Sequence, residues 1–489
     1  MSVRSTSAWG DRQAGSTGIQ TKLPFPEQTK LPGPARPGLP LLLRGSAGKA
    51  LQVLVLGVLG TAVGAGFLEA QFPAYPYEIP EYDFIRYDSN RFVFPGDSSS
   101  WENFMAGFSR MVREGDNRLT IVHIGGSHIQ ADVYPNRIRE RLQTFQPGSN
   151  GGRGLVFPFS VARTNNPANY LVGYSGKWTS CSNTGNTAEC PLGLTGISVT
   201  TYDTTAAITI GFPEGNAVKY DFNRVRVFCL GDSLALGCRI RAGTEEGMED
   251  YPVLTAPWNG DTEAGDAGSS PDSGHGLLVW DLGKYADRLE ISLQRTSPSQ
   301  ERFTLFGISL ETDDPGLVYH SVGVNGAKVP SFLGCRLLPE HLAALSPDLV
   351  ILSLGTNDAY TRYFDPGVYK RRYDSLIRII SEAVPRAAIL LTVPNDSYLY
   401  RRYINPNTAK VREVLMELAA EHNCGVWDFY TVMGGLNSIV VWQRFGLARR
   451  DRIHFTVKGY LLQGDLFFNA FLKSYDNFID RSNRTNRRP

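Results

Sequence analysis

Four polar side chains in this sequence have the types that nucleophilic cleavage of an ester requires. Ser127 and Asn357 each follow a run of apolar residues typical of a buried strand, and Asp451 and His454 lie close together near the C-terminal end. A hydroxyl nucleophile needs a base that takes its proton, an acid that orients the base, and donors for the developing oxyanion. Parallel strands gather such groups at their carboxyl ends. The sequence therefore predicts a serine esterase.

A second serine, Ser233, competes for the role of nucleophile. It lies in the string Gly-Asp-Ser-Leu at residues 231–234, between two runs that alternate as strands do. Such a string between two strands is typical of a hairpin turn. Ser127 is instead followed by apolar residues at helical spacing, and the N-terminus of a helix stabilises negative charge. We therefore assign the nucleophile to Ser127.

The segments around these residues resemble the SGNH (GDSL-type) hydrolases. They occur in the family's order, and the resemblance covers roughly residues 116–150 and 315–478. The matching segments are Gly-Gly-Ser127-His, Val-Asn-Gly326-Ala, Gly-Thr-Asn357-Asp and Asp451-x-x-His454-Phe-Thr-x-x-Gly-Tyr.

The resemblance implies a role for each matching residue. Ser127 would be the nucleophile, His454 the general base and Asp451 the acid that orients it. The backbone N–H groups of Ser127 and Gly326 and the side-chain amide of Asn357 would form the oxyanion hole. The resemblance implies no cofactor, and no group of His and Cys residues in the sequence has the spacing of metal ligands, so we expect neither.

One position departs from the family pattern. Gly126 stands directly before Ser127, where the family usually has Asp. The departure puts the rigidity of the oxyanion loop in doubt, but it removes no catalytic group.

The elements predicted around the candidate site alternate between strands and helices. This pattern predicts an α/β fold, a doubly wound parallel sheet of SGNH-hydrolase type, formed by residues 116–149 and 313–480. Residues 150–312 contain short alternating runs separated by Gly, Ser and Thr, which predict an inserted β-sandwich domain of jelly-roll type. Residues 71–115 are expected to form an extended linker and the start of the hydrolase domain, and residues 481–489 a basic tail.

The N-terminal part of the chain has the composition of a targeting segment. Residues 1–49 are rich in Pro, Gly and Ser and carry more basic than acidic side chains, which predicts a disordered leader. Within residues 50–70, the uncharged run 51–67 has a length between that of a signal sequence and that of a short membrane span. The positive flank predicts export of the rest of the chain. We therefore expect a periplasmic or cell-envelope protein, with residues 51–67 either cleaved or kept as an inner-membrane anchor.

Cysteine spacing fits an exported protein. Cys181 and Cys190 are nine residues apart, and so are Cys229 and Cys238. In an oxidising compartment each pair can close a short loop as a disulfide. The alternative is four reduced cysteines in the core.

The charge balance and the resemblance narrow the function further. With 49 Lys and Arg against 48 Asp and Glu, the chain has no overall field that attracts nucleic acid. An SGNH hydrolase with an inserted β domain is similar to the bacterial peptidoglycan O-acetylesterases. We therefore expect removal of O-acetyl groups from peptidoglycan or another acetylated polysaccharide. The alternatives are a glycan O-acetyltransferase with the same triad and a catalytically inactive glycan-binding protein.

Aromatic side chains of the insertion have two competing interpretations. Stacking on sugar rings near the active site and packing in the core of the insertion are equally compatible with the sequence. The residues concerned are Tyr170, Tyr174, Trp178 and Trp258.

Overall fold

The computed structural model describes residues 79–185, 190–256 and 275–486. The predicted leader, the apolar run 51–67 and Trp258 lie outside these residues. Across the three described ranges, no helix combines the length and the apolar character that a membrane crossing needs.

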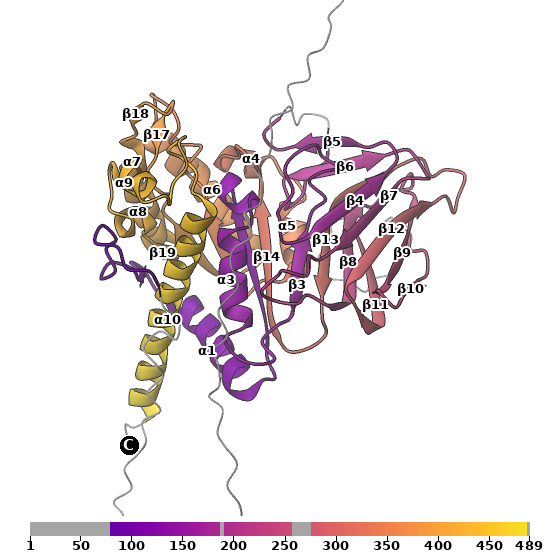
Figure 1. The fold of residues 1–489 in the computed structure, drawn as a ribbon, viewed down its shortest axis with the longest axis horizontal. Helices are drawn as coiled ribbons and strands as arrows, with labels where there is room; N and C mark the ends of the chain where they lie inside the picture. Colours follow the sequence, from indigo (N-terminus) through magenta and orange to yellow (C-terminus); the bar gives the residue numbers. More distant parts are fainter. Residues whose placement is uncertain (1–78, 186–189, 257–274, 487–489) are drawn as a thin grey trace, which may run out of the picture. The chain divides into compact units, whose positions relative to one another are not determined.

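A six-stranded sheet forms the α/β part of the chain (Figure 1). Its strand order is β1-β19-β16-β15-β2-β14, and every neighbouring pair is parallel except β1 with β19. The strands are β1 (Phe92–Val93), β2 (Arg118–Gly125), β14 (Gly316–Gly323), β15 (Leu349–Ser353), β16 (Ala388–Thr392) and β19 (Gly425–Trp427). Because neighbouring strands run the same way, the loops after β2, β15 and β16 meet at one edge of the sheet.

Helices cover both faces of this sheet. Leu119 and Ile121 of β2 pack in a cluster with α1, α3 and α10, whereas Val122 and Ile124 of the same strand pack in a second cluster with α5, α6 and α7. The alternation follows the two-residue period of a strand and gives the doubly wound arrangement. These helices are α1 (Ser99–Glu114), α3 (Tyr134–Gln143), α5 (Leu338–Leu345), α6 (Pro366–Ala383), α7 (Asn407–His422) and α10 (Val457–Asn486).

The chain between α3 and β14 forms two antiparallel sheets. One has the order β10-β9-β12-β7-β4 and the other β11-β8-β13-β6-β5, with β3 also paired to β13. Their strands are β3 (Gly152–Val156), β4 (Leu171–Ser175), β5 (Thr179–Ser182), β6 (Ile197–Thr201), β7 (Ala207–Gly211), β8 (Phe222–Leu230), β9 (Gly237–Thr244), β10 (Gly247–Asp250), β11 (His275–Ala286), β12 (Arg288–Gln294) and β13 (Phe303–Glu311). The protein is therefore a mixed α/β fold with several sheets, and the strands of these two antiparallel sheets fall within residues 150–312, the stretch predicted to be rich in β structure.

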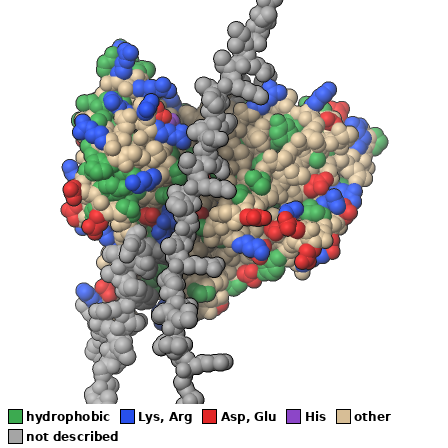
Figure 2. Space-filling model, in the orientation of Figure 1, with side chains coloured by type: hydrophobic (Ala, Val, Ile, Leu, Met, Phe, Trp, Pro, Cys, Tyr) green, Lys and Arg blue, Asp and Glu red, His purple; other side chains and the backbone are tan. Residues whose placement is uncertain are grey.

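Strand β3 connects the antiparallel sheets to the parallel one. It pairs with β13 and also lies against β14, and the apolar residues of both regions share one hydrophobic cluster. On the face drawn in Figure 2, basic and acidic side chains alternate over the antiparallel sheets. This mixture agrees with the balanced net charge of the chain.

The two predicted cysteine pairs differ in the structure. Cys181 and Cys190 form a disulfide, whereas Cys229 and Cys238 are free and buried. The prediction of a disulfide is thus confirmed for the first pair, and the second pair follows the alternative of reduced core cysteines.

Candidate active site

Ser127 lies on a sharp turn between β2 and the short helix α2 (Ser127–Gln130). Gly125 ends the strand, and a Cβ there would lie 2.4 Å from the Ile129 side chain and 2.8 Å from the Ser353 carbonyl oxygen. Only glycine fits such a turn. The carbonyl oxygen of Gly126 then accepts hydrogen bonds from the N–H groups of Ile129 and Gln130, both at 3.0 Å. The turn is therefore fixed on both sides of the serine.

The structure brings Ser127, His454 and Asp451 into one chain of hydrogen bonds. The Ser127 Oγ lies 2.9 Å from the His454 Nε2, and the His454 Nδ1 lies 2.9 Å from the Asp451 Oδ2. A carboxylate against Nδ1 favours the tautomer in which Nδ1 carries the proton, so Nε2 is free to accept one from the serine. This is the arrangement that the sequence predicted.

Backbone hydrogen bonds hold the carboxylate of Asp451 in place. Its Oδ1 accepts from the N–H groups of Ile453, at 2.9 Å, and His454, at 3.0 Å. Partial burial raises the pKa of Asp451, but the hydrogen bonds from the His454 ring and from these two N–H groups outweigh burial and hold the pKa well below its usual value. Asp451 is therefore ionised and oriented at neutral pH.

Asn357 and the loop of Gly326 adjoin the serine turn. The Asn357 Nδ2 donates to the Ala327 carbonyl oxygen at 3.0 Å, and Gly326 has a φ of +81°, which favours glycine. The loop is attached to the serine turn by the N–H of Asn325, which donates to the Gln130 Oε1 at 2.7 Å. The structure thus brings together all five residues predicted for the site.

The position of Gly126 has a steric explanation. A Cβ at this residue would lie 3.1 Å from the Asn357 Nδ2, closer than ordinary van der Waals contact. An Asp here would therefore press on the amide predicted to bind the oxyanion. The hydrogen bonds of the Gly126 carbonyl and of Gln130 hold the loop without that carboxylate.

Ser233 lies far from these groups in the fold. It is exposed on the turn between β8 and β9, where Asp232 forms an ion pair with Arg302. Within the described ranges, its hydroxyl makes no hydrogen bond to a histidine. The turn predicted from the Gly-Asp-Ser string is observed.

The sequence did not indicate that His128 packs on the base or that Tyr460 contacts His128. The ring of His128 is stacked on that of His454 with centroids 5.1 Å apart, and the His128 Nδ1 lies 3.0 Å from the Tyr460 hydroxyl. Burial, together with the neighbouring His454, lowers the pKa of His128 to about 3, so this ring stays neutral. Both residues lie inside the matched segments, but their contact joins positions 332 residues apart.

No metal site accompanies the triad. Among the residues that the structure describes, no group of three or more His, Cys, Asp or Glu side chains is placed to hold a metal ion.

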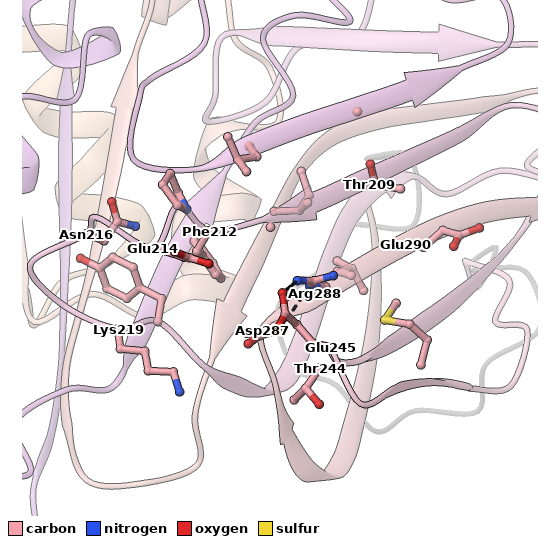
Figure 3. A pocket seen from close by; sticks show the side chains of 18 of the residues that line it. Thr209, Phe212, Glu214, Asn216, Lys219, Thr244, Glu245, Asp287, Arg288 and Glu290 are labelled. Carbon is pink, nitrogen blue, oxygen red and sulfur yellow. Dashed lines mark hydrogen bonds and ion pairs between the residues drawn. The ribbon is translucent and has the colours of Figure 1, made fainter. Parts of the chain in front are cut away.

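A groove of about 1230 Å³ lies on the five-stranded antiparallel sheet, away from the triad (Figure 3). Its lining includes Lys219 and Arg288, but acidic side chains are more numerous there. The lining of the groove contains neither Ser127 nor His454. The acidic lining residues are Glu214, Glu245, Glu246, Asp287 and Glu290.

Residues 229–462 match the model of the GDSL-like Lipase/Acylhydrolase family. The match begins just before the Gly-Asp-Ser-Leu string, contains Asn357, Asp451 and His454, and does not reach Ser127. No curated protein sequence matched the chain.

One solved structure shares most of this fold, and two others are similar to a smaller part of the chain. A structure described as a peptidoglycan O-acetylesterase in action is 21% identical and has a TM-score of 0.60, with 79% of this chain and 99% of that chain covered. A lipase/acylhydrolase from Enterococcus faecalis is 22% identical over 33% of this chain and 77% of its own, with a TM-score of 0.26. An acetylxylan esterase from Geobacillus stearothermophilus is 22% identical over 32% of this chain and 72% of its own, also with a TM-score of 0.26.

Proposed function

We propose that this chain, of which residues 229–462 match the model of the GDSL-like Lipase/Acylhydrolase family, is a serine esterase that removes O-acetyl groups from a glycan. The observation that carries the proposal is the hydrogen-bond chain from Ser127 through His454 to Asp451. It joins residues from two ends of the sequence at the carboxyl edge of a parallel sheet, where α/β enzymes bind their substrates.

The proposed reaction has two steps. The Ser127 Oγ attacks the acetyl carbonyl carbon while the His454 Nε2 takes the serine proton, and Asp451 stabilises the imidazolium. The oxyanion donors stabilise the negative charge that develops on the carbonyl oxygen. When this tetrahedral intermediate collapses, the sugar oxygen leaves and takes the proton from His454. His454 then deprotonates a water that attacks acetyl-Ser127. When this second intermediate collapses, acetate leaves and His454 returns the proton to the Ser127 Oγ. The donors are the N–H groups of Ser127 and Gly326 and the amide of Asn357.

The choice of an acetylated glycan rests on the fold as a whole. We infer that the two antiparallel sheets are the predicted β-sandwich inserted in the hydrolase. The likeness to the peptidoglycan O-acetylesterase structure covers 79% of the chain, far more than the hydrolase segments alone, which supports this interpretation. That fold likeness, with the acetylesterase activity in the other protein's description, makes peptidoglycan the first substrate to test.

The aromatic residues named for sugar stacking contribute unequally to this proposal. Tyr170 is buried and its hydroxyl donates to the Phe157 carbonyl oxygen at 2.7 Å, so it belongs to the core. Tyr174 is 51% exposed and remains available to a sugar ring. Trp178 is partly buried against the core. The Cys181–Cys190 disulfide supports an exported, oxidising location.

Two serine variants test the proposal. Acetate release from O-acetylated peptidoglycan, acetylated xylan and an aryl acetate is measured for the wild type, Ser127→Ala and Ser233→Ala. We expect Ser127→Ala to lower kcat by about 10⁴–10⁶-fold and Ser233→Ala to keep it, because only Ser127 contacts the base. The Ser127→Ala, His454→Ala double variant costs little more, because the triad acts as a unit.

Three outcomes separate the alternatives. Full activity in Ser127→Ala overturns the choice of nucleophile. Acetyl transfer to an added sugar acceptor, in place of acetate release, identifies an O-acetyltransferase. Binding of acetylated glycan without turnover identifies an inactive glycan-binding protein.

A further inference from the structure

Exposed and half-buried tyrosine and arginine side chains border the loops that hold Asn357 and His454. We call Tyr360, Arg362, Tyr400, Arg401 and Tyr403 the arginine–tyrosine rim. The first two directly follow the Asn357 loop after β15, and the other three lie on the hairpin of β17 (Tyr398–Leu399) and β18 (Tyr403–Ile404) after β16. Strands β16, β15 and β2 are adjacent, so the rim lies at the same sheet edge as Ser127.

The hairpin is attached to the loop of the triad. The N–H of Tyr398 donates to the Arg452 carbonyl oxygen at 2.9 Å, and the guanidinium of Arg452 lies 4.7 Å from the centre of the Tyr398 ring. The Asn395 Nδ2 donates to the Ile453 carbonyl oxygen at 2.9 Å. Arg452 and Ile453 separate Asp451 from His454 in the sequence. The start of the hairpin is therefore fixed against the loop that carries the catalytic base.

The side chains of the rim order one another. The Arg362 guanidinium carbon lies 5.6 Å from the Tyr400 ring centre and 5.7 Å from the Tyr403 ring centre. The ring centres of Tyr360 and Tyr400 are 5.6 Å apart, and the Tyr360 hydroxyl accepts from the Tyr400 N–H at 2.9 Å. A guanidinium held over two rings keeps its N–H edge for a planar anion. Tyr400 is 51% exposed and Tyr403 is 53% exposed, so both keep a surface for a sugar ring.

Four exposed arginines lie near this edge of the sheet. In the part of the chain that the structure describes, Arg362, Arg401, Arg402 and Arg450 are exposed and form no ion pair. Figure 2 shows Lys and Arg gathered over the region of β17 and β18, in contrast to the mixed charges over the antiparallel sheets.

The nearby carboxylates are engaged elsewhere. Asp358 accepts from the Val329 N–H at 3.1 Å, Asp365 caps α6 by accepting from the Val368 N–H at 3.0 Å, and Asp396 is buried. The rim therefore presents positive charge that a ligand can neutralise.

Two residues of the hairpin turn have backbone angles that are unfavourable for large side chains. Tyr400 has a φ of 52° and Arg401 a φ of 63°, the left-handed region that two-residue hairpins usually fill with Asn and Gly. Large side chains in this region weaken a fold, and such positions are common at ligand-binding sites. The turn thus exposes a ring and a cation where a glycine would be more stable.

We propose that the arginine–tyrosine rim binds a carboxylate-bearing stretch of the glycan beside the ester that is cleaved. The inference rests on the proposed esterase function and narrows its substrate to acetylated glycans that carry anionic groups. The Tyr400 and Tyr403 rings pack on sugar faces, and Arg362 forms a paired hydrogen bond with a carboxylate. The carboxylate belongs either to a uronic acid of the chain or to a peptide attached to the glycan.

Steady-state kinetics on three acetylated substrates test the proposal. They are O-acetylated peptidoglycan, an O-acetylated polyuronate and neutral acetylated xylo-oligosaccharides. The two rim variants are Arg362→Gln and a double variant, Arg401→Gln with Arg402→Gln. The second also removes Arg402, the exposed arginine that follows the rim residue Arg401. Arg295→Gln is the matched control, because Arg295 is exposed in the loop after β12 and lies in no ion pair within the described ranges.

We expect KM for one of the charged substrates to rise about tenfold in each rim variant while kcat stays within a factor of about two. KM for the neutral oligosaccharide changes far less, so the ratio of the two KM values moves. Added salt raises the KM of the wild type for the charged substrate, and it removes the difference in KM between the wild type and the variants. The charged substrate that responds identifies the source of the carboxylate.

The two proposals fail in different ways. If the wild type releases acetate from none of the three substrates, the esterase function fails and the rim is left without a role in it. If acetate is released but KM responds equally for charged and neutral substrates, or in no rim variant, the esterase stands and the rim proposal is wrong. A KM change of the same size in Arg295→Gln also contradicts the rim proposal.

Discussion

At the scale of single residues, Asn357 is the clearest test of the oxyanion hole. Asn357 does not cap a helix, because the next helix, α6, begins only at Pro366. Asn357→Ala removes one oxyanion donor and is expected to lower kcat by about 10²–10³-fold. It also removes the bond to the Ala327 carbonyl, so the free energy of unfolding falls by about 1 kcal/mol.

Kinetics and denaturant unfolding on one preparation separate these two effects. Asn103→Ala, at an exposed position of α1, is the control and keeps both quantities. A variant of Asn357 that loses stability but keeps its kcat assigns the side chain a purely structural role.

Gly126 gives a second residue-scale prediction. Because a Cβ there would lie 3.1 Å from the Asn357 Nδ2, Gly126→Ala displaces the amide by a few tenths of an ångström. We expect kcat to fall by about 10–10²-fold with little change in KM. Gly211→Ala, where no atom lies within 4 Å of the added Cβ, is the control. Unchanged turnover in Gly126→Ala shows that the amide does not need its present position.

Ser127, Asp451 and His454 were predictable because short segments carry both the residue types and their order. The stacking of His128 on His454 was not predictable, because it depends on how two distant loops approach each other. Nor does the sequence indicate why Gly126 replaces an Asp. That reason is a contact with Asn357, more than 200 residues away in the chain.

At the scale of elements, a buried cluster of charged side chains joins helix α3, which follows the serine turn, to strand β3 of the antiparallel region. Asp132, between α2 and α3, accepts from Arg139 of α3 at 3.2 Å, from Arg153 of β3 at 2.5 Å and from the Asn169 amide at 2.8 Å. Burial raises the pKa of Asp132, but the charges of Arg139 and Arg153 outweigh burial and lower it. The carboxylate therefore stabilises the fold above its unfolded pKa, and this contribution is lost as the pH falls through the folded pKa.

Removing this charge leaves two buried arginines without a counter-ion. We expect Asp132→Asn to lower the free energy of unfolding by about 3–5 kcal/mol, measured by urea denaturation at pH 7. Asp250→Asn, which breaks an exposed pair with Arg239, is the control and costs less than about 1 kcal/mol. Equal small losses in both variants contradict a structural role for the cluster.

The parallel strands were predictable because strands covered on both faces are continuous apolar runs, as in β15 and β16. The β17–β18 hairpin was not, because its turn residues Tyr400 and Arg401 lack the Asn-Gly signal of such turns. The pairing of β3 with β13, and its contact with β14, likewise depends on long-range packing.

At the scale of the whole molecule, the site exists only when distant parts of the chain have folded together. The serine and its base are 327 residues apart, and the antiparallel sheets lie between them in the sequence. The hydrophobic cluster shared by those sheets and the parallel sheet couples the two regions. Loss of stability in either region is therefore expected to reduce activity.

Buried neutral histidines predict how this stability depends on pH. Burial lowers the pKa of His123 and of His320 to about 3, against the opposing charges of Asp132 near the first and Glu311 near the second. The unfolded chain binds these protons near pH 6.5, whereas the folded chain does not. Each histidine thus contributes stability that is fully present above pH 6.5 and is lost as the pH falls toward 3.

Asp358 and Asp396 act in the opposite direction over part of this range. Burial raises the pKa of each to about 6, so their contributions are present at low pH and are lost as the pH rises through 6. Burial also lowers the pKa of His128 and of His341, so these four buried histidines outweigh the two carboxyls, and we expect the free energy of unfolding to fall between pH 6 and pH 4.

Urea unfolding at several pH values between 4 and 6 measures how steeply the free energy of unfolding changes with pH, which we call the slope. The substitution His123→Asn removes one titrating group that bonds to the Tyr319 and Ser353 hydroxyls, and it lowers the stability at every pH. The slope is the specific readout, and we expect it to decrease by about 1.4 kcal/mol per pH unit. Asn405→Ala, at a buried side chain that does not titrate, is the control, and it lowers the stability without changing the slope. An identical slope in His123→Asn and wild type means that the acid sensitivity arises elsewhere in the fold.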